Sequence, residues 1–498
     1  MNKIMIYLIS QFFFVSIFSQ AIRIPLEQNN YEKVTSYDQL TEFVKHLDEK
    51  STVLNVEIIG QSVQGRNLYA LKFSSSAFGK DKSKIKVLFF AQQHGNEQSG
   101  KEGALILALE LLKPENSYLF DKIDFALIPQ MNPDGSELNK RRNANETDLN
   151  RNHLILTEPE VMALHRFFER YMFEVNLDVH EYYPFGETWE KFGYRKNADV
   201  TIGVATNNNI SSKIRDLSNN EIVPFWLKYL ADKGFSSFIY CPGGPPGLDY
   251  FRHSTFDIND GRQSFGILNT FCFIQEGLNG KDSYIENIKQ RANGQMNGMY
   301  ALIVYIYNRA KEMKKIVASE RNLHKKLNEA EYVSIQAQHV KDGRKLHIPM
   351  FSYYSGKDSL FEVEDYRPVV KSISDVEVPE GYLLPKSDPE LIEWSKKYNL
   401  FSTEFKPGKK LKIKQYRVES IDSIDFEGDR AANPKLSEKD ATGSINYSEY
   451  IFIPTRQLKK KAIVLALEPR SMLGLATYKQ FSSLLKQGEI FPVLKVLK

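Results

Sequence analysis

Residues 91–104, AQQHGNEQSGKEGA, join an apolar run typical of a β-strand (IKVLFF, 85–90) to one typical of a helix (ALILALELL, 104–112). His94 and Glu97 stand three positions apart in the turn between them. An imidazole nitrogen and a carboxylate oxygen both suit zinc, and a turn at a strand end can bring them to one ion. By itself the pair is a weak signal, because most His-x-x-Glu pairs are solvated neighbours on helix surfaces.

The sequence around this stretch alternates between apolar strands and amphipathic helices. We expect strands at 84–91, 124–130, 175–182 and 264–275, helices at 31–50, 102–112, 158–172 and 284–327, and a hairpin at 56–73. Continuous apolar strands separated by helices are typical of an α/β domain. The sequence therefore predicts a mixed, mostly parallel central sheet flanked by helices.

The pattern changes after about residue 330. Short alternating segments spaced by turns predict strands, among them LHIPMF (346–351) and KAIVLALEP (461–469), with one helix near 389–398. We expect a signal peptide over 1–21, an α/β domain over 22–328 and a smaller β-rich domain over 329–498.

Composition and charge restrict the possible functions. The chain has 498 residues, 42% of them hydrophobic and 26% charged, which is an ordinary globular composition. Its 66 basic and 62 acidic residues nearly balance, and no basic tract tracks phosphate, so nucleic-acid binding is not expected. Cys241 and Cys272 could pair in an exported chain, or Cys272 could be a buried thiol.

The N-terminus has the pattern of a signal peptide. MNK supplies positive charge, residues 4–18 are almost purely apolar, and Ser19-Gln20-Ala21 offers small residues for cleavage. The alternative, a membrane anchor, needs roughly 20 apolar residues. We expect cleavage near Ala21 and an exported protein (periplasmic, secreted or at the cell surface) with no later membrane span.

A third metal ligand has a candidate in LDVHEY (177–182), where His180 ends an apolar strand. Strand ends of an α/β sheet converge at one edge, so His180 is expected near His94. Asp178 lies two residues earlier, hence on the same face, and could orient the ring of His180. The alternative is that His180 is a core histidine with satisfied hydrogen bonds.

The loop between these segments, NPDGSELNKRRNANETDLNRN (132–152), is rich in arginine and asparagine. It opens with a turn signal and crowds these residues around 148–151. A guanidinium fork matches a carboxylate, so the loop indicates anion recognition. The alternative is a solvated loop.

Together these motifs resemble, in the right order, the zinc metallocarboxypeptidases of the carboxypeptidase A type. The resemblance covers about 55–310 and rests on HGNE, NPDG, the R-x-N-x-N-x-x-D-L-N-R-N run, His-Glu-Tyr after a strand, and a strand ending at Glu276. The tail from residue 466, ALEPRSMLGLATYKQF…FPVLKV, is similar to the β-rich extension of some exported bacterial members.

The resemblance implies roles for the metal and for catalysis. His94, Glu97 and His180 match the ligands of one Zn²⁺ ion. Glu276 matches the general base, and Arg141 matches the arginine that polarises the scissile carbonyl.

It also implies roles in the substrate cleft. Asp148 matches a carboxylate behind the first histidine ligand, and Tyr182 matches a tyrosine that lines the cleft. Asn150 and Arg151 match the pair that grips the free C-terminal carboxylate of the substrate.

Two positions in the cleft stay open. The mobile cleft tyrosine of the family could be Tyr240 or Tyr250, with Tyr250 the better spaced from Glu276. Arg262 falls near the residue that sets side-chain preference, where it would favour acidic C-terminal residues. The alternative is that Arg262 makes a structural ion pair.

The sequence thus predicts an exported zinc-dependent carboxypeptidase acting on peptide or protein C-termini. An amidase or carboxypeptidase on cell-wall peptides and an acyl-amino-acid deacylase are the alternatives among enzymes. A zinc-free binding scaffold is the alternative from another class. The C-terminal domain could bind glycan or substrate, or could only brace the first domain.

Overall fold

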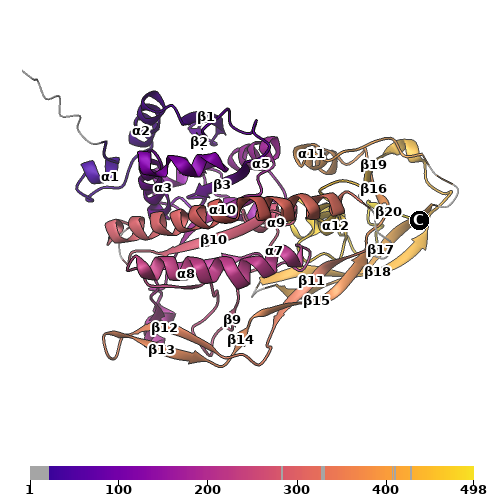
Figure 1. Cartoon of the computed structure of the whole chain (residues 1–498). Coiled ribbons are helices and arrows are strands. Elements are labelled where there is room, and N and C mark those ends of the chain that lie inside the picture. Colours follow the sequence, from indigo (N-terminus) through magenta and orange to yellow (C-terminus); the bar gives the residue numbers. More distant parts are fainter. Residues whose placement is uncertain (1–21, 282–283, 327–330, 407, 409–410, 427–428) are drawn as a thin grey trace, which may run out of the picture.

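The structure is a computed structural model that describes residues 22–498 except 282–283, 327–330, 407, 409–410 and 427–428 (Figure 1). The expected signal peptide over 1–21 lies outside the described residues. Within the described part of the chain, no helix is both long and apolar enough to cross a bilayer.

An eight-stranded mixed sheet organises the first region, with the strand order β1-β2-β4-β3-β5-β10-β7-β8. Its strands are β1 (Leu54–Gln61), β2 (Asn67–Phe73), β3 (Ile85–Ala91), β4 (Ile123–Ile128), β5 (Val175–Tyr182), β7 (Val200–Val204), β8 (Ser237–Ile239) and β10 (Phe271–Leu278). The four central strands β4, β3, β5 and β10 run parallel to their neighbours in this group. The predicted fold class is confirmed.

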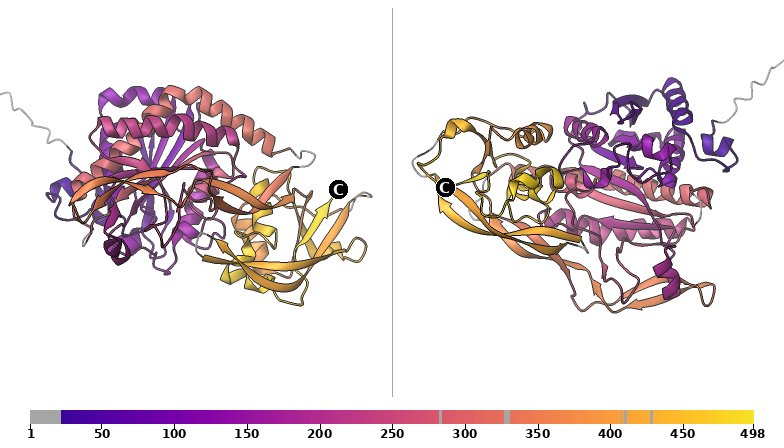
Figure 2. Two further views of the ribbon diagram at one scale, coloured as in Figure 1. Left: turned by 90° about the horizontal axis from the view of Figure 1, so that it is seen from below. Right: turned by 180° about the vertical axis from the view of Figure 1, so that it is seen from behind.

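Helices cover this sheet, which explains why its central strands are apolar on both faces. All six residues of β4, IDFALI, are buried. The main helices are α2 (Tyr37–Lys50), α3 (Gln98–Leu111), α5 (Pro159–Tyr171), α8 (Val223–Asp232) and α10 (Ile288–His324). Of these, α3 and α8 pack against α10 on one side of the strands (Figure 2), and α2 and α5 contact β1.

Short helices connect these elements. They are α1 (Pro25–Gln28), α4 (Pro133–Glu137), α6 (Glu187–Phe192), α7 (Ser212–Leu217) and α9 (Gln263–Gly266). The expected strand over 264–275 was placed too early, because α9 occupies its first residues and β10 begins at Phe271.

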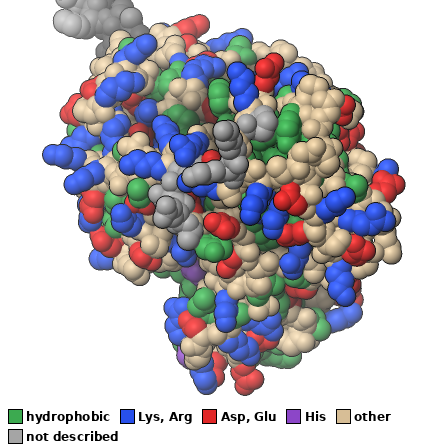
Figure 3. Space-filling view, turned by 90° about the vertical axis from the view of Figure 1, so that its right-hand side faces the viewer, with side chains coloured by type: hydrophobic (Ala, Val, Ile, Leu, Met, Phe, Trp, Pro, Cys, Tyr) green, Lys and Arg blue, Asp and Glu red, His purple; other side chains and the backbone are tan. Residues whose placement is uncertain are grey.

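The second region is β-rich, as predicted. A five-stranded antiparallel sheet has the order β18-β17-β20-β16-β19. Its strands are β16 (Gly381–Pro385), β17 (Lys412–Phe426), β18 (Asp429–Asp440), β19 (Tyr450–Pro454) and β20 (Leu494–Leu497), beside the pair β11 (Tyr332–Val340) and β15 (Val369–Glu377). Figure 3 shows acidic and basic side chains interspersed over the face seen from this side.

Two predictions for the second region have opposite outcomes. The helix near 389–398 is confirmed as α11 (Pro389–Lys397). The strand expected over 461–469 is wrong, since these residues form most of the helix α12 (Lys460–Leu467), in which every residue except Lys461 is buried. A short continuous apolar run does not distinguish a buried strand from a buried helix.

Strands from the second region complete sheets of the first. β12 (Leu346–Ser352) pairs with β13 (Lys357–Val363) on one side and with β6 (Tyr194–Lys196) on the other. β14 (Tyr366–Arg367) pairs with β9 (Phe251–Arg252). One hydrophobic cluster joins these strands, formed by Trp189, Cys241, Phe251, Leu346, Ile348, Met350, Val363 and Tyr366. The two regions therefore share packed interior between β6 and β12.

Candidate active site

His94 and Glu97 lie in the turn that joins the end of β3 to the start of α3. Its Gly95 is required by close packing, since a Cβ there would lie 2.2 Å from the carbonyl carbon of Gly135. The Gly95 N–H donates to the carbonyl of Arg141 at 3.2 Å. The turn is thereby fixed to the loop that carries the predicted arginines.

Three donor side chains converge beside this turn. His94 Nδ1 lies 2.7 Å from Glu97 Oε1, and His180 Nδ1 lies 2.9 Å from Glu97 Oε2. The two Nδ1 atoms are 3.1 Å apart. All three side chains are buried, and one ligand atom from each falls within 4.8 Å of the others. Two imidazole nitrogens and one carboxylate are a donor set of catalytic zinc sites, so these residues fit the ion.

A carboxylate stands behind each histidine. His94 Nε2 lies 3.1 Å from Asp148 Oδ1, and His180 Nε2 lies 2.9 Å from Asp178 Oδ1. Carboxylates in these positions can orient each ring so that Nδ1 faces the centre of the site. The positions of Asp148 and Asp178 thus match the orienting roles expected for them.

The site is a buried network of opposite charges. Burial alone would raise the pKa of Glu97, but His94 and His180 hold it well below its ordinary value. Burial would likewise lower the pKa of His180, yet Asp178 and Glu97 raise it well above its ordinary value. Glu97 is thus held as an anion beside a His180 ring that keeps its proton, and a cation bound between them would displace that proton.

Glu276 lies next to the donors on the same sheet. It pairs in register with His180 across the parallel strands β10 and β5. Burial raises the pKa of Glu276 to about 7, and the charge of Glu97 adds to this while His180 opposes it. A carboxyl group with a pKa near neutrality can exchange a proton at physiological pH.

A cleft of about 370 Å³ opens over these groups. Among the residues that line it are nine of those predicted for the site: His94, Glu97, Arg141, Asn150, Arg151, His180, Tyr182, Arg262 and Glu276. Residues scattered over more than 180 positions of sequence thus meet in one cavity.

Arg141 projects over the ligands and is half exposed. Its Nε donates to Asp148 Oδ2 at 3.1 Å, and its Nη1 lies 3.6 Å from Glu97 Oε1. A guanidinium at this place can meet negative charge that develops on a substrate beside the donors.

Asn150 and Arg151 lie on one wall of the cleft. Asn150 Oδ1 accepts from the N–H of Gly261 at 2.7 Å, and its Nδ2 lies 3.3 Å from His180 Nε2. Arg151 is exposed and donates through Nη1 to the carbonyl of Asn150 at 2.8 Å. Its other guanidinium nitrogens can therefore face a ligand.

The three tyrosines considered for the cleft differ in their positions. Tyr182 donates its hydroxyl to the carbonyl of Ala198 at 2.5 Å and presents its ring to the cleft. Tyr240 also lines the cleft. Tyr250 is not among the residues that line it; the Arg367 guanidinium lies 4.0 Å from the centre of its ring. The structure therefore brings Tyr240, not Tyr250, to the site.

Arg262 lines the cleft but its charge is engaged within the wall. Its Nη2 lies 2.9 Å from Asp260 Oδ2, and both terminal nitrogens also donate to hydroxyls, those of Ser254 and Thr255. The side chain is almost fully buried. Of the two alternatives for Arg262, this arrangement agrees with the structural ion pair rather than with a residue that selects the substrate side chain.

Lys196 on β6 is a cleft residue that the sequence did not indicate. Its Nζ donates to the carbonyl of Cys241 at 2.5 Å and lies 4.9 Å from the centre of the Phe251 ring. Burial lowers its pKa to about 8. It lies in the stretch 183–260, where no motif distinguished it. Cys241 and Cys272 are both buried free thiols, so they do not pair in this structure.

Comparison with known proteins agrees with this geometry. Residues 40–221 match the family model of the zinc carboxypeptidases, Peptidase_M14. Carboxypeptidase 2 of Trichophyton rubrum is 27% identical over 239 residues, which cover 45% of this chain and 44% of that protein. The human carboxypeptidase N catalytic chain is 27% identical over 289 residues, covering 48% and 60%. The chain thus spans about half the length of the curated relatives it matches.

Solved structures are similar at lower identity. The carboxypeptidase A of Helicoverpa armigera is 18% identical, with a TM-score of 0.44 over 56% of this chain and 75% of that one. A metallo-carboxypeptidase from Pseudomonas aeruginosa is 20% identical, with a TM-score of 0.43 over 57% and 71%.

The buried His-Glu-His site lies within the residues that match the family model. The match of residues 40–221 to the zinc carboxypeptidase model confirms the family resemblance expected from the motifs.

Proposed function

We propose that this chain is an exported zinc-dependent carboxypeptidase that hydrolyses the C-terminal peptide bond of its substrates. The observation that carries the proposal is the convergence of His94, Glu97 and His180 with Glu276 held one strand away. A scaffold without metal chemistry would have no need for a buried carboxyl group beside two histidines.

His94, Glu97 and His180 would hold the ion. Zinc supplies Lewis-acid polarisation of the scissile carbonyl and lowers the pKa of water when bound. Glu276 takes the proton of the attacking water and returns it to the leaving amine. Its pKa near neutrality suits both transfers.

Arg141 and Arg151 act on the substrate. Arg141 stands over the ligands, where it meets the oxyanion formed as the carbonyl is attacked. Arg151, supported by Asn150, binds the free C-terminal carboxylate of the peptide in a charge-assisted pair. A requirement for that carboxylate confines cleavage to chain ends.

Export rests on the sequence pattern of residues 1–21. Cleavage near Ala21 gives a mature chain that begins close to Ile22. N-terminal sequencing of the protein recovered from outside the cytoplasm tests this part of the proposal.

The activity is tested on the chain from Ile22 onward. Zinc content is measured, and a peptide with a free C-terminus is compared with its C-terminal amide, with and without chelator, by mass spectrometry. We expect stoichiometric zinc and chelator-sensitive loss of single residues from the free acid only.

Other results lead to the alternatives. Zinc without trimming of peptides would transfer the proposal to cell-wall peptides or acyl amino acids, which also carry a carboxylate. A protein that binds no zinc and cleaves nothing would overturn the enzyme and leave a binding scaffold.

A further inference from the structure

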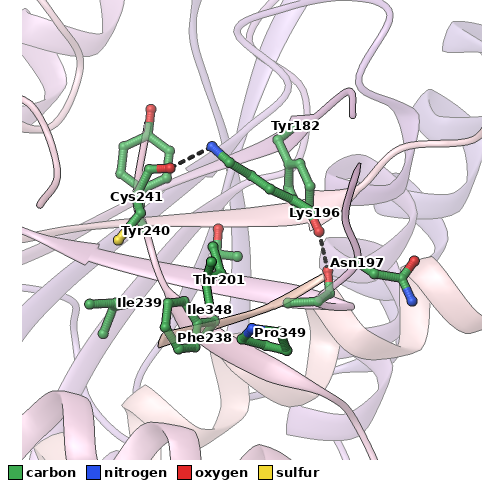
Figure 4. A pocket seen from close by; sticks show the side chains of 11 residues that line it. Tyr182, Lys196, Asn197, Thr201, Phe238, Ile239, Tyr240, Cys241, Ile348 and Pro349 are labelled. Atoms are coloured by element: carbon green, nitrogen blue, oxygen red, sulfur yellow. Dashed lines mark hydrogen bonds between the residues drawn. The ribbon is translucent and has the colours of Figure 1, made fainter. Parts of the chain in front are cut away.

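A second, smaller pocket lies beside the cleft (Figure 4). Its volume is about 40 Å³, and almost all of its exposed wall is carbon. It is lined by Tyr182, Lys196, Asn197, Ala198, Thr201, Phe238, Ile239, Tyr240, Cys241, Ile348 and Pro349. None of the roles in the proposed hydrolysis requires this space.

The pocket adjoins the cleft. Tyr182, Lys196 and Tyr240 line both. Thr201 pairs in register with Glu276 across the antiparallel strands β7 and β10, so the pocket begins one strand away from the proposed general base. Side chains paired in register point to the same face of a sheet.

Strand register places the pocket relative to a bound peptide. Asn150, which supports Arg151 in the proposed binding of the substrate carboxylate, lies at the level of Asp178 in the sheet. Gln93 Nε2 connects the two, since it donates both to Asp178 Oδ2 at 2.8 Å and to Asn150 Oδ1 at 3.2 Å. His180 and Glu276 lie at the next level on this face, two residues further along their strands.

Tyr182 lies two residues further again on the same face. A peptide whose carboxylate meets Arg151 and whose scissile carbonyl lies beside His180 therefore continues toward Tyr182. Its residue on the amino side of the scissile bond is thereby brought next to Tyr182, which lines the pocket.

The outer wall comes from the second region. Ile348 and Pro349 lie on β12, which is held against β6 by the pairing of Met350 with Lys196. Figure 4 shows these two side chains below Thr201 and beside Phe238. The hairpin of β12 and β13 thus closes a cavity next to the candidate active site.

We propose that this pocket is a specificity subsite that binds a short aliphatic side chain, of alanine to valine size, on the amino side of the scissile bond. The inference rests on the proposed carboxypeptidase function. The carbon-lined wall and the neighbouring charge of Lys196 exclude cationic side chains, because their desolvation would be uncompensated. The volume exceeds the roughly 10–15 Å³ that one water needs but is far below the roughly 150 Å³ of a cavity that binds benzene.

The test uses blocked dipeptides with a constant, well-cleaved C-terminal residue and Gly, Ala, Val, Leu or Phe before it. We expect the wild type to cleave Ala and Val substrates about tenfold or more faster than Phe, measured as kcat/KM. Ile348→Ala enlarges the pocket and is expected to shift the preference toward Leu and Phe. Ala198→Val fills it and is expected to lower cleavage of the Val substrate most.

Leu360→Ala is the matched control. Leu360 is 69% exposed and is the register partner of Pro349 on β13, so it shares the hairpin but not the pocket. It is expected to keep the wild-type profile. Zinc content and thermal denaturation of each variant show whether the fold is kept.

The outcomes separate the two proposals. A wild type that cleaves these peptides with no preference before the scissile bond overturns the subsite and leaves the carboxypeptidase intact. A preference that neither pocket variant changes also overturns the subsite. If the zinc-loaded wild type cleaves none of the peptides, the proposed function itself fails.

Discussion

Glu276 and His180 are direct partners across the parallel strands β10 and β5. Neighbouring strands lie about 4.8 Å apart, and partners in register project to the same face. The proposed base and a proposed metal ligand are therefore fixed relative to each other by sheet hydrogen bonds rather than by a loop. A site held by its central strands needs little reorganisation during a reaction.

The first prediction follows from this pairing. Glu276→Gln keeps the shape of the side chain but cannot take a proton. We expect kcat to fall by about 10²- to 10⁴-fold while zinc stays bound, because only the proton transfer is lost. Steady-state kinetics and metal analysis on the same sample measure both. Glu187→Gln, at an exposed position, is the control and is expected to keep the wild-type kcat. A Glu276→Gln enzyme that stays fully active would contradict the role of Glu276 as general base.

A second prediction concerns the carboxylate behind His180. Asp178→Asn leaves the ligands in place but weakens the hold on the ring at Nε2. We expect zinc affinity to fall by about 10- to 100-fold, and His180→Ala to reduce it further. Competition with a zinc chelator measures both. Asp232→Asn, at an exposed position, is expected to bind zinc like the wild type.

Arg151 gives a third prediction. Arg151→Met removes the proposed partner of the C-terminal carboxylate. We expect kcat/KM for the free peptide to fall by at least about 100-fold, with much less effect on any cleavage of the peptide amide. Equal losses on both substrates would argue against the clamp. Arg166→Met at an exposed position of α5 controls for loss of positive charge.

The fourth prediction concerns acid stability and a pair of buried histidines. His153 Nδ1 lies 3.0 Å from His165 Nε2, and His153 Nε2 lies 2.7 Å from Gln93 Oε1. Burial lowers the pKa of His153 to about 4, whereas the unfolded value is about 6.5. The unfolded chain therefore binds this proton first as the pH falls.

We expect the contribution of His153 to the free energy of unfolding to be fully present above pH ~6.5. It should be lost as the pH falls toward ~4, by up to about 3 kcal/mol. Urea denaturation of the metal-free protein at pH 7.5 and pH 5 measures the loss. His153→Gln is expected to reduce the difference, and the exposed His46→Gln is not. An unchanged pH dependence in His153→Gln would show that other groups govern it.

Much of the site could be predicted because its chemistry follows strand ends. His94, Glu97, His180 and Glu276 each stand at or just after the carboxyl end of a central strand. Apolar runs mark those strands in the sequence, so topology predicts that His94 and His180 meet at one edge of the sheet, whereas the role of Glu276 was predicted from the family resemblance.

The rest depended on segments with no periodic signal. Tyr240 and Tyr250 are ten residues apart in a loop rich in glycine and proline, and spacing favoured Tyr250, which the chain path carries away from the cleft. Lys196 and Thr201 belong to short strands whose partners are remote in sequence. Tertiary contacts of this kind decide which face a short strand presents, and no local pattern records them.

The pairing of β12 with β6 also has consequences for truncated forms of the protein and for its folding during synthesis. A protein truncated near residue 330 would lose β12 and β14, the strands that pair with β6 and β9, and would uncover the apolar side chains of Trp189 and Phe251. Open strand edges next to apolar surface invite aggregation. During synthesis, the ligands and the base emerge well before Ile348, so the nascent chain holds its catalytic groups before the wall beside them exists.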